Sequence, residues 1–318
     1  MMLYNVRENV LDTFTLETYQ KTMGEDVPYG KYILPSVEHG SYKIEEYIKS
    51  KKPFAIARLG ETEQRVIGYG LLNSVPKWNI LKQRRVLQTE CANWCEGAGF
   101  FPKKLGLLPK FVETYIDAFK EIDMLAIWGQ KYEPYLLNNY MPNACICRAK
   151  SLAVVENEIP WTRQLKGMRV LVVSPFAESI ERQYEKRLLL HRNNELLPEF
   201  ELKTLKAVQS PRISGKKSKH SNWFCALDWM YNETININYD VALLGCGAYA
   251  FPLATLIKSS GHGAITTCGG TQLIFGIMGK RWDTSDYREL LGVNENWVYP
   301  SRDEIPHHLK RVENGCYW

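Results

Sequence analysis

The chain has 318 residues, of which 45% are hydrophobic and 24% are charged, and these proportions are typical of a globular protein. The formal net charge of +5 is small and does not indicate the concentrated basic face of a nucleic-acid-binding protein. No apolar run reaches the roughly 18 residues of a membrane span, and the N-terminus lacks the apolar core of a signal peptide, so we expect a cytoplasmic protein.

The first fifty residues are polar and rich in turn-forming residues, and we expect residues 1–50 to form an N-terminal arm that packs on the core. Apolar residues at helical spacing predict one helix in this arm, at Val37–Lys49. Residues 54–60 then form a short apolar run, which predicts a buried strand that ends in a turn at Gly60. A helical region should then continue to about residue 120.

Apolar strands alternate with helices over the rest of the chain. The expected strands are Met124–Gly129, Ala144–Ala149, Met168–Ser174, Leu202–Val208, Val241–Leu244 and Ala264–Cys268. The expected helices are a long one from Pro175 to about His191, then Ser221–Asn236, Phe251–Ser260 and Thr271–Met278. Strands without polar alternation are typical of a parallel sheet that is covered on both faces. We therefore predict that residues 51–318 form an α/β, Rossmann-like domain with a mostly parallel sheet and helices on both faces.

Turns that follow the strands are the candidate sites, because ligands of open parallel sheets bind beyond the carboxyl ends of the strands. The first such turn is Arg58-Leu-Gly60-Glu61-Thr-Glu63. If its backbone stays extended, Glu61 and Glu63 point to the same side and could share one Mg²⁺ or Mn²⁺ ion. Arg58 could hold a phosphate in a two-pronged contact. The alternative is a helix whose first turn carries acids that complement the helix dipole.

The same turn resembles the Arg-x-Gly-Asp-x-Glu signature of the GT-D-fold bacterial glycosyltransferases, with Glu61 in place of the more usual Asp. Further segments resemble that family in the same order along the chain, namely Val170–Glu178, Asp240–Tyr249, Gly269–Gly276 and Asn314–Trp318. The resemblance implies a GT-D-type fold and places the acidic pair at a metal and sugar-nucleotide site. It therefore implies that Glu61 and Glu63 bind Mn²⁺ or Mg²⁺ and that Glu63 takes part in catalysis.

Three later turns supply further candidate groups. Gly245-Cys-Gly247 lies between an expected strand and an expected helix, where backbone N–H groups face an anion. No acid follows about 20 residues later, which argues against a nicotinamide dinucleotide. Ser174 precedes a helix start, and Glu178 in its first turn is a candidate base for an acceptor hydroxyl. The expected donor-binding residues are Arg58, Gly60, Ser174, Gly245, Gly247, Gly270, Thr271 and Gln272.

Two basic clusters lie in expected loops. Lys103-Lys104 with Lys110 is typical of a solvated loop. The second cluster, Lys216–His220, follows an expected exposed loop at Ser210–Gly215. It could meet a pyrophosphate or an anionic membrane surface.

The function that the resemblance implies is transfer of a sugar from a nucleotide-sugar donor, with UDP as the expected carrier. The acceptor would be a glycan or a lipid-linked glycan, in the synthesis of a bacterial surface polysaccharide or glycoprotein glycan. We expect no nucleic-acid partner and at most a peripheral contact with the inner face of the membrane. One alternative is a non-catalytic protein that binds nucleotide sugars or glycans. Another is a hydrolase with a Cys246 nucleophile, which would need a base such as His220 or His262.

Overall fold

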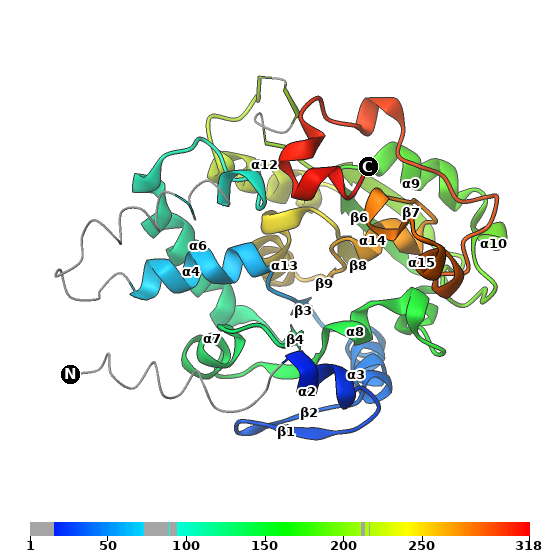
Figure 1. Ribbon diagram of the computed structural model, residues 1–318, viewed down its shortest axis with the longest axis horizontal. Coiled ribbons are helices and arrows are strands. Elements are labelled where there is room, and N and C mark those ends of the chain that lie inside the picture. The colour runs from blue at the N-terminus through cyan, green and yellow to red at the C-terminus, as the bar shows by residue number, and fades with distance from the viewer. Residues whose placement is uncertain (1–15, 73–88, 90–93, 211–213, 216) are drawn as a thin grey trace.

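The computed structural model describes residues 16–72, 89, 94–210, 214, 215 and 217–318 of the chain (Figure 1). Its centre is a sheet of seven strands in the order β5-β4-β3-β9-β8-β6-β7, and every neighbouring pair is parallel. The strands are β3 (Phe54–Ala57), β4 (Met124–Ile127), β5 (Cys145–Arg148), β6 (Arg169–Ser174), β7 (Glu201–Lys206), β8 (Val241–Leu244) and β9 (Gly263–Thr266). The predicted α/β fold with a parallel sheet is confirmed.

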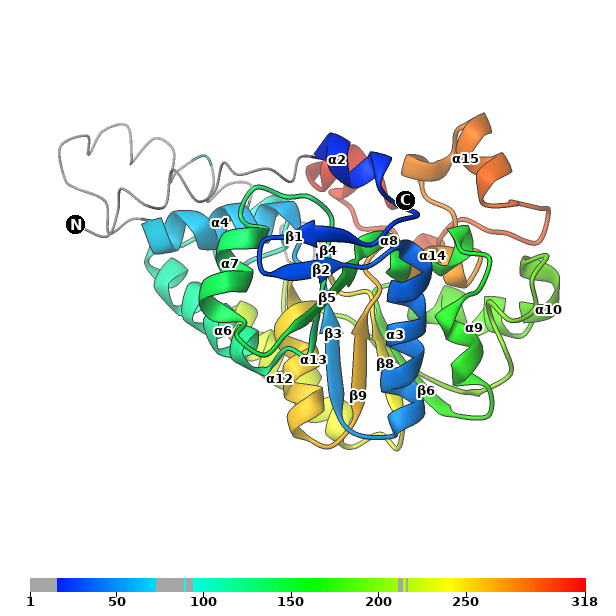
Figure 2. The same cartoon turned by 90° about the horizontal axis from the view of Figure 1, so that it is seen from below.

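Helices cover both faces of this sheet (Figure 2). The longer helices are α3 (Val37–Ser50), α4 (Glu61–Leu72), α6 (Leu108–Glu121), α7 (Glu133–Tyr140), α9 (Ala177–Tyr184), α12 (Trp223–Ile235) and α13 (Ala250–Ser259). The shorter ones are α2 (Leu16–Lys21), α8 (Ala149–Leu152), α10 (Arg187–Leu190), α14 (Gly270–Ile274) and α15 (Ser285–Leu290). None of the described helices is both long and apolar enough to cross a lipid bilayer.

The side chains of a strand contribute to two hydrophobic clusters, one on each face of the sheet, because they alternate between the faces. In β3, Ala55 and Ala57 face a cluster formed with α4, α6, α12 and α13, whereas Phe54 and Ile56 face a cluster formed with α3, α9 and α14. Burial of both faces explains why the strands are apolar throughout and show no polar alternation.

One buried arginine of the sheet holds the N-terminal part, residues 16–36, by hydrogen bonds, in addition to the apolar packing of Tyr19, Tyr29 and Leu34. A two-stranded hairpin, β1 (Val27–Tyr29) and β2 (Tyr32–Leu34), precedes α3. The fully buried guanidinium of Arg148, at the end of β5, donates hydrogen bonds to the backbone carbonyl oxygens of Tyr19, Thr22, Glu25 and Pro35. These bonds satisfy the donors of Arg148 with backbone acceptors of the N-terminal part.

Two predicted helices are shorter in the structure. The helix expected at Thr271–Met278 ends at Ile274. The long helix expected after Pro175 ends at Tyr184, and a separate turn of helix follows at Arg187–Leu190. The ring of Tyr184 stacks on Phe200 at 4.6 Å, and its hydroxyl donates to the carbonyl oxygen of Phe200. This tertiary contact holds the helix end against the segment before β7. The sequence also gave no indication of the β1–β2 hairpin.

Candidate functional site

The carboxyl ends of β3 and β9 open a crevice, because the helices that follow these neighbouring strands go to opposite faces of the sheet. Val66 and Ile67 of α4 belong to one hydrophobic cluster, whereas Ile274 of α14 belongs to the other. Divergence of this kind is the usual origin of ligand sites in open parallel sheets.

A cavity of about 530 Å³ occupies this crevice. The segments that line it follow six of the seven strands, and they bring together turns that are distant in the sequence. Its walls include Arg58, Gly60–Glu63, Trp128, Ser174–Phe176, Ala207–Ser210, Gly245–Cys246–Gly247, Tyr249–Phe251, Cys268, Gly269, Thr271 and Gln272. Of the predicted site residues, only Gly270 and Glu178 are not among the lining residues.

Arg58 is held at the centre of the crevice. Its backbone N–H donates to the Thr266 hydroxyl at 3.0 Å, and its guanidinium carbon lies 4.9 Å from the centroid of the Trp128 ring. The pKa of Arg58 is raised above its usual range, chiefly by the Cys268 thiol and also by Tyr317 and Glu63. The guanidinium therefore keeps its charge and can face an anionic ligand.

The two acids of the turn do not share one side, and the extended backbone considered above is wrong. Helix α4 begins at Glu61, so Glu61 and Glu63 lie in its first turn, as the helix alternative stated. Residues two apart on a helix do not face each other. Glu61 has 58% of its side chain exposed and lies 3.6 Å from Arg65, its i+4 neighbour. Glu63 folds back, with a carboxylate oxygen where a Gly60 side chain would begin.

The environment of Glu63 differs from that of Glu61. Glu63 is partly buried, and desolvation raises the pKa of its carboxyl, although the charge of Arg58 and its own backbone N–H act in the opposite direction. Within the described residues, no group of three or more His, Cys, Asp or Glu side chains could hold a metal ion. A divalent cation at this turn would therefore need ligand atoms from a bound molecule.

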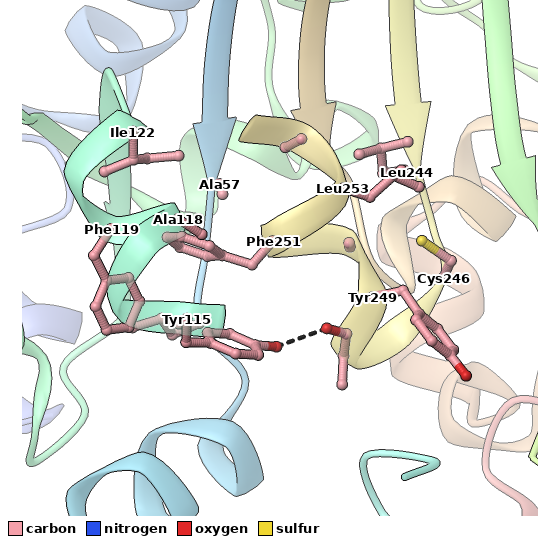
Figure 3. Close-up of a cluster of buried hydrophobic side chains, with 14 of the residues drawn as sticks. Ala57, Tyr115, Ala118, Phe119, Ile122, Leu244, Cys246, Tyr249, Phe251 and Leu253 are labelled. Atoms are coloured by element: carbon pink, nitrogen blue, oxygen red, sulfur yellow. Dashed lines mark hydrogen bonds between the residues drawn. The ribbon is translucent and has the colours of Figure 1, made fainter. Parts of the chain in front are cut away.

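The turn after β8 forms another wall of the cavity. Gly245 has no room for a side chain, because a Cβ atom there would lie 2.4 Å from the Thr271 hydroxyl oxygen, and Gly247 has a φ of +61°. Figure 3 shows Tyr115 of α6 reaching this turn, where its hydroxyl donates to the Ala248 carbonyl at 2.7 Å. The ring of Tyr249 stacks on Trp223 at 4.8 Å. The turn is thus fixed from both sides before helix α13 begins.

The turn after β9 is joined to the C-terminal segment. Gln272 is buried, and its Nε2 atom donates to the carbonyl oxygen of Tyr317 at 2.9 Å. The Thr271 and Thr267 hydroxyl oxygens lie 2.6 Å apart. Two buried polar atoms of lining residues have no hydrogen-bond partner within the described part of the chain, namely Gln272 Oε1 and the Tyr249 hydroxyl. A bound molecule with hydrogen-bonding groups could satisfy both.

Ser174 and Glu178 separate in the structure. Ser174 is buried in the cavity wall, and its hydroxyl accepts a hydrogen bond from the Phe176 N–H at 3.2 Å. Glu178 lies outside the lining and binds Lys206 of β7 at 2.7 Å. The Lys206 ammonium lowers the pKa of the Glu178 carboxyl. Glu178, which the sequence suggested as a catalytic base, is therefore engaged in an ion pair with the edge strand β7.

The lining also contains Trp128, Arg281, Tyr317 and Trp318, which were not among the predicted donor-binding residues. Arg281 is exposed, and its guanidinium carbon lies 4.8 Å from the Tyr317 ring centroid. The Arg281 N–H donates to the Cys316 carbonyl at 2.9 Å. The only available signal was the pairing of cationic and aromatic residues, Lys280-Arg281-Trp282 and Tyr317-Trp318.

Cys246 lines the cavity but is 7% exposed, and burial raises the pKa of its thiol. The described lining residues include no histidine. His262 instead stacks on Tyr239 at 4.4 Å, and His220 lies against Trp229 at 5.1 Å. The thiol therefore lacks the neighbouring base that a cysteine nucleophile requires.

Comparison of the chain with protein-family models, with curated proteins and with solved structures finds no match.

Proposed function

We propose that this protein is a glycosyltransferase of the GT-D type that transfers a sugar from a nucleotide-sugar donor to a hydroxyl of a glycan or lipid-linked glycan acceptor. The observation that carries the proposal is the convergence of Arg58, Glu63 and the turns at Gly245 and Thr271 on one cavity. These are residues of the segments that resemble the GT-D family. UDP is the expected carrier by the same resemblance.

The cationic wall of the cavity suits the diphosphate of such a donor. Arg58 and Arg281 each present a guanidinium that is placed over an aromatic ring, Trp128 and Tyr317 respectively. The ten-residue helix α13 begins beside the Gly245–Tyr249 turn and adds the positive end of its dipole. As the bond to the diphosphate breaks, negative charge grows there, and these groups stabilise it.

The unsatisfied polar atoms suit the nucleoside or the sugar. Gln272 Oε1 only accepts hydrogen bonds, so its partner would be an N–H or O–H group of the nucleotide sugar. The Tyr249 hydroxyl can donate or accept. Leaving such atoms unpaired in a buried site is unfavourable by roughly 1–3 kcal/mol each, and a ligand that pairs them recovers this free energy.

Glu63 is the acid that we assign to catalysis. Its raised pKa makes it a better proton acceptor than an ordinary carboxylate. In the transfer, the acceptor oxygen bonds to the anomeric carbon while the bond from that carbon to the diphosphate oxygen breaks. The proton of the acceptor hydroxyl passes to Glu63, and the nucleoside diphosphate leaves with the electron pair. Glu178, paired with Lys206, has no part in this scheme.

Glu61 is the better candidate for a Mn²⁺ or Mg²⁺ ligand, because it lines the cavity and is half exposed. One carboxylate together with phosphate oxygens of the donor is a common ligand set for such cations. A bound cation would supply further positive charge at the leaving diphosphate.

Thermal unfolding with UDP-, GDP- and CMP-sugars, each with and without Mn²⁺, tests the proposal. A donor at about one hundred times its Kd should stabilise the chain by about 2.7 kcal/mol. Release of the nucleoside diphosphate in the presence of an acceptor should follow. Binding without turnover on any acceptor would favour the non-catalytic alternative. No stabilisation by any nucleotide sugar would contradict the proposal.

A further inference from the structure

Two stretches of the chain carry cations without any acid. Residues 97–112 and 202–227 contain no Asp or Glu. Within them, Lys203 and Lys206 are paired with Glu201 and Glu178. Five other lysines are exposed and form no ion pair within the described part of the chain. We call them the lysine face, and they are Lys103, Lys104, Lys110, Lys217 and Lys219.

Direct contacts join the two stretches. The Trp223 N–H donates to the Phe101 carbonyl at 2.8 Å, and the Lys110 ammonium lies 4.5 Å from the centroid of the Phe224 ring. The ring of Phe100 packs against Phe224 at 5.7 Å. The two basic clusters, separate in the sequence, therefore belong to one surface region.

This surface region borders the cavity. Gly97–Gly99 and Ala207–Ser210 are lining segments, and the lysines of the lysine face follow one or the other of them within eleven residues of chain. Neighbouring cations that lack carboxylate partners produce a positive field that attracts anions.

An exposed leucine lies among these cations. Leu105 is 40% exposed and directly follows Lys103-Lys104. A soluble polyanion offers no apolar region into which the Leu105 side chain could insert. An anionic lipid surface accommodates both parts, since headgroups attract lysines and the acyl boundary takes up apolar side chains.

We propose that the lysine face docks on an anionic phospholipid surface with Leu105 inserted at its boundary. Docking would hold the cavity mouth beside the lipid headgroups, where a lipid-linked acceptor would present its hydroxyl. The proposal does not depend on the reaction, because lipid binding is measured without donor or acceptor.

Flotation of the full chain with lipid vesicles tests the proposal. Vesicles of phosphatidylglycerol mixed with phosphatidylcholine should carry the protein upward, whereas phosphatidylcholine alone should not, and raised salt should weaken binding. The double variant Lys104→Gln/Lys219→Gln should lower the partition coefficient about 25-fold, because each lysine near the surface contributes about five-fold.

The matched control is Lys52→Gln/Lys166→Gln. Both residues are exposed and precede strands β3 and β6, at the opposite end of the sheet from the cavity. This variant has the same net charge as the first, and we expect its binding to stay within about two-fold of the parent. Equal losses in the two double variants, or no preference for phosphatidylglycerol, would overturn the proposal.

Leu105→Gln separates a lipid surface from a soluble polyanion. It should weaken vesicle binding while leaving binding to inorganic polyphosphate unchanged. If Leu105→Gln has no effect on vesicle binding and polyphosphate binds as tightly as the vesicles, the face serves a soluble polyanion and the lipid proposal fails. Near-ultraviolet circular dichroism of each variant confirms that its packing is intact.

Discussion

The side chain of Gln272 is fixed by the backbone of Tyr317, forty-five residues away in the sequence. Because Nε2 donates to the Tyr317 carbonyl at 2.9 Å, the amide cannot turn over without placing two acceptors together. Its Oε1 atom therefore has one available direction, and it has no partner within the described residues. The C-terminal segment thus sets the hydrogen-bonding character of a residue that lies in the β9–α14 turn.

Gln272→Leu should weaken nucleotide-sugar binding about five-fold, because the ligand loses a hydrogen-bond acceptor, and a net hydrogen bond contributes about 1 kcal/mol. Isothermal calorimetry measures this change. Gln64→Leu is the matched control, since Gln64 is also buried, its Oε1 has no hydrogen-bond partner in the described part of the chain, and it does not line the cavity. Equal affinity losses in the two variants would mean that the effect comes from packing and not from the site.

Glu63→Gln and Glu61→Gln should separate proton transfer from cation binding. Glu63→Gln keeps the shape of the side chain but cannot take the acceptor proton, so kcat should fall about 100-fold or more with little change in donor affinity. Glu61→Gln should raise the Mn²⁺ concentration needed for half-maximal rate, and added Mn²⁺ should restore the rate. Initial rates across a metal titration distinguish the two. A normal kcat in Glu63→Gln would remove Glu63 from the catalytic scheme.

Arg58→Lys should lower donor affinity about ten-fold although the charge is retained. Lysine lacks the planar fork that binds two phosphate oxygens and the flat face that packs on Trp128. Arg169→Lys is the control, because Arg169 pairs with Asp240 at the start of β6, away from the cavity lining. Unchanged donor affinity with a sharply lower Tm in Arg58→Lys would instead assign Arg58 a structural role.

Stability should fall as pH rises because of Glu133. This buried carboxyl accepts hydrogen bonds from the N–H groups of Trp128, Gly129 and Gln130, and desolvation raises its pKa from 4.5 to about 8. Between these values the folded state holds a proton that the unfolded state has lost, so each pH unit removes up to about 1.4 kcal/mol.

Denaturant titrations from pH 5 to 8 check this slope. Glu133→Gln should flatten this dependence of stability on pH, because an amide does not titrate. The variant should still fold, since its amide oxygen can accept hydrogen bonds from the Gly129 and Gln130 N–H groups. The same slope in the variant would mean that the three N–H groups keep Glu133 ionised in the folded protein.

The parallel sheet could be predicted because strands such as Val241–Leu244 are apolar on both sides, and the structure has that strand at the predicted residues. The backbone after Gly60 could not be assigned from the sequence alone, which allowed either an extended segment or the start of a helix. Acids near a helix start and acids beside a metal have the same local spacing, and packing of α4 on α6 decides between them.

The contact between Arg281 and Tyr317 could not be predicted from the sequence, for a different reason. Their position depends on close docking of two distant segments, and a Cβ atom at Gly279 would lie only 2.8 Å from the Tyr317 carbonyl oxygen. No local pattern records such an approach, because the glycine that permits it also occurs in ordinary turns.

Arg148 binds the N-terminal part through main-chain carbonyl oxygens. Every amino acid supplies such an oxygen, whatever its side chain. The residues of that part which face solvent can therefore be exchanged widely, provided that the path of the chain is kept. A peptide tag or a binding sequence inserted at the tip of the hairpin, around the exposed Gly30 and Lys31, should leave the attachment at Arg148 intact. The hairpin is thus a replaceable module, which an engineer or natural variation could alter without disturbing the crevice.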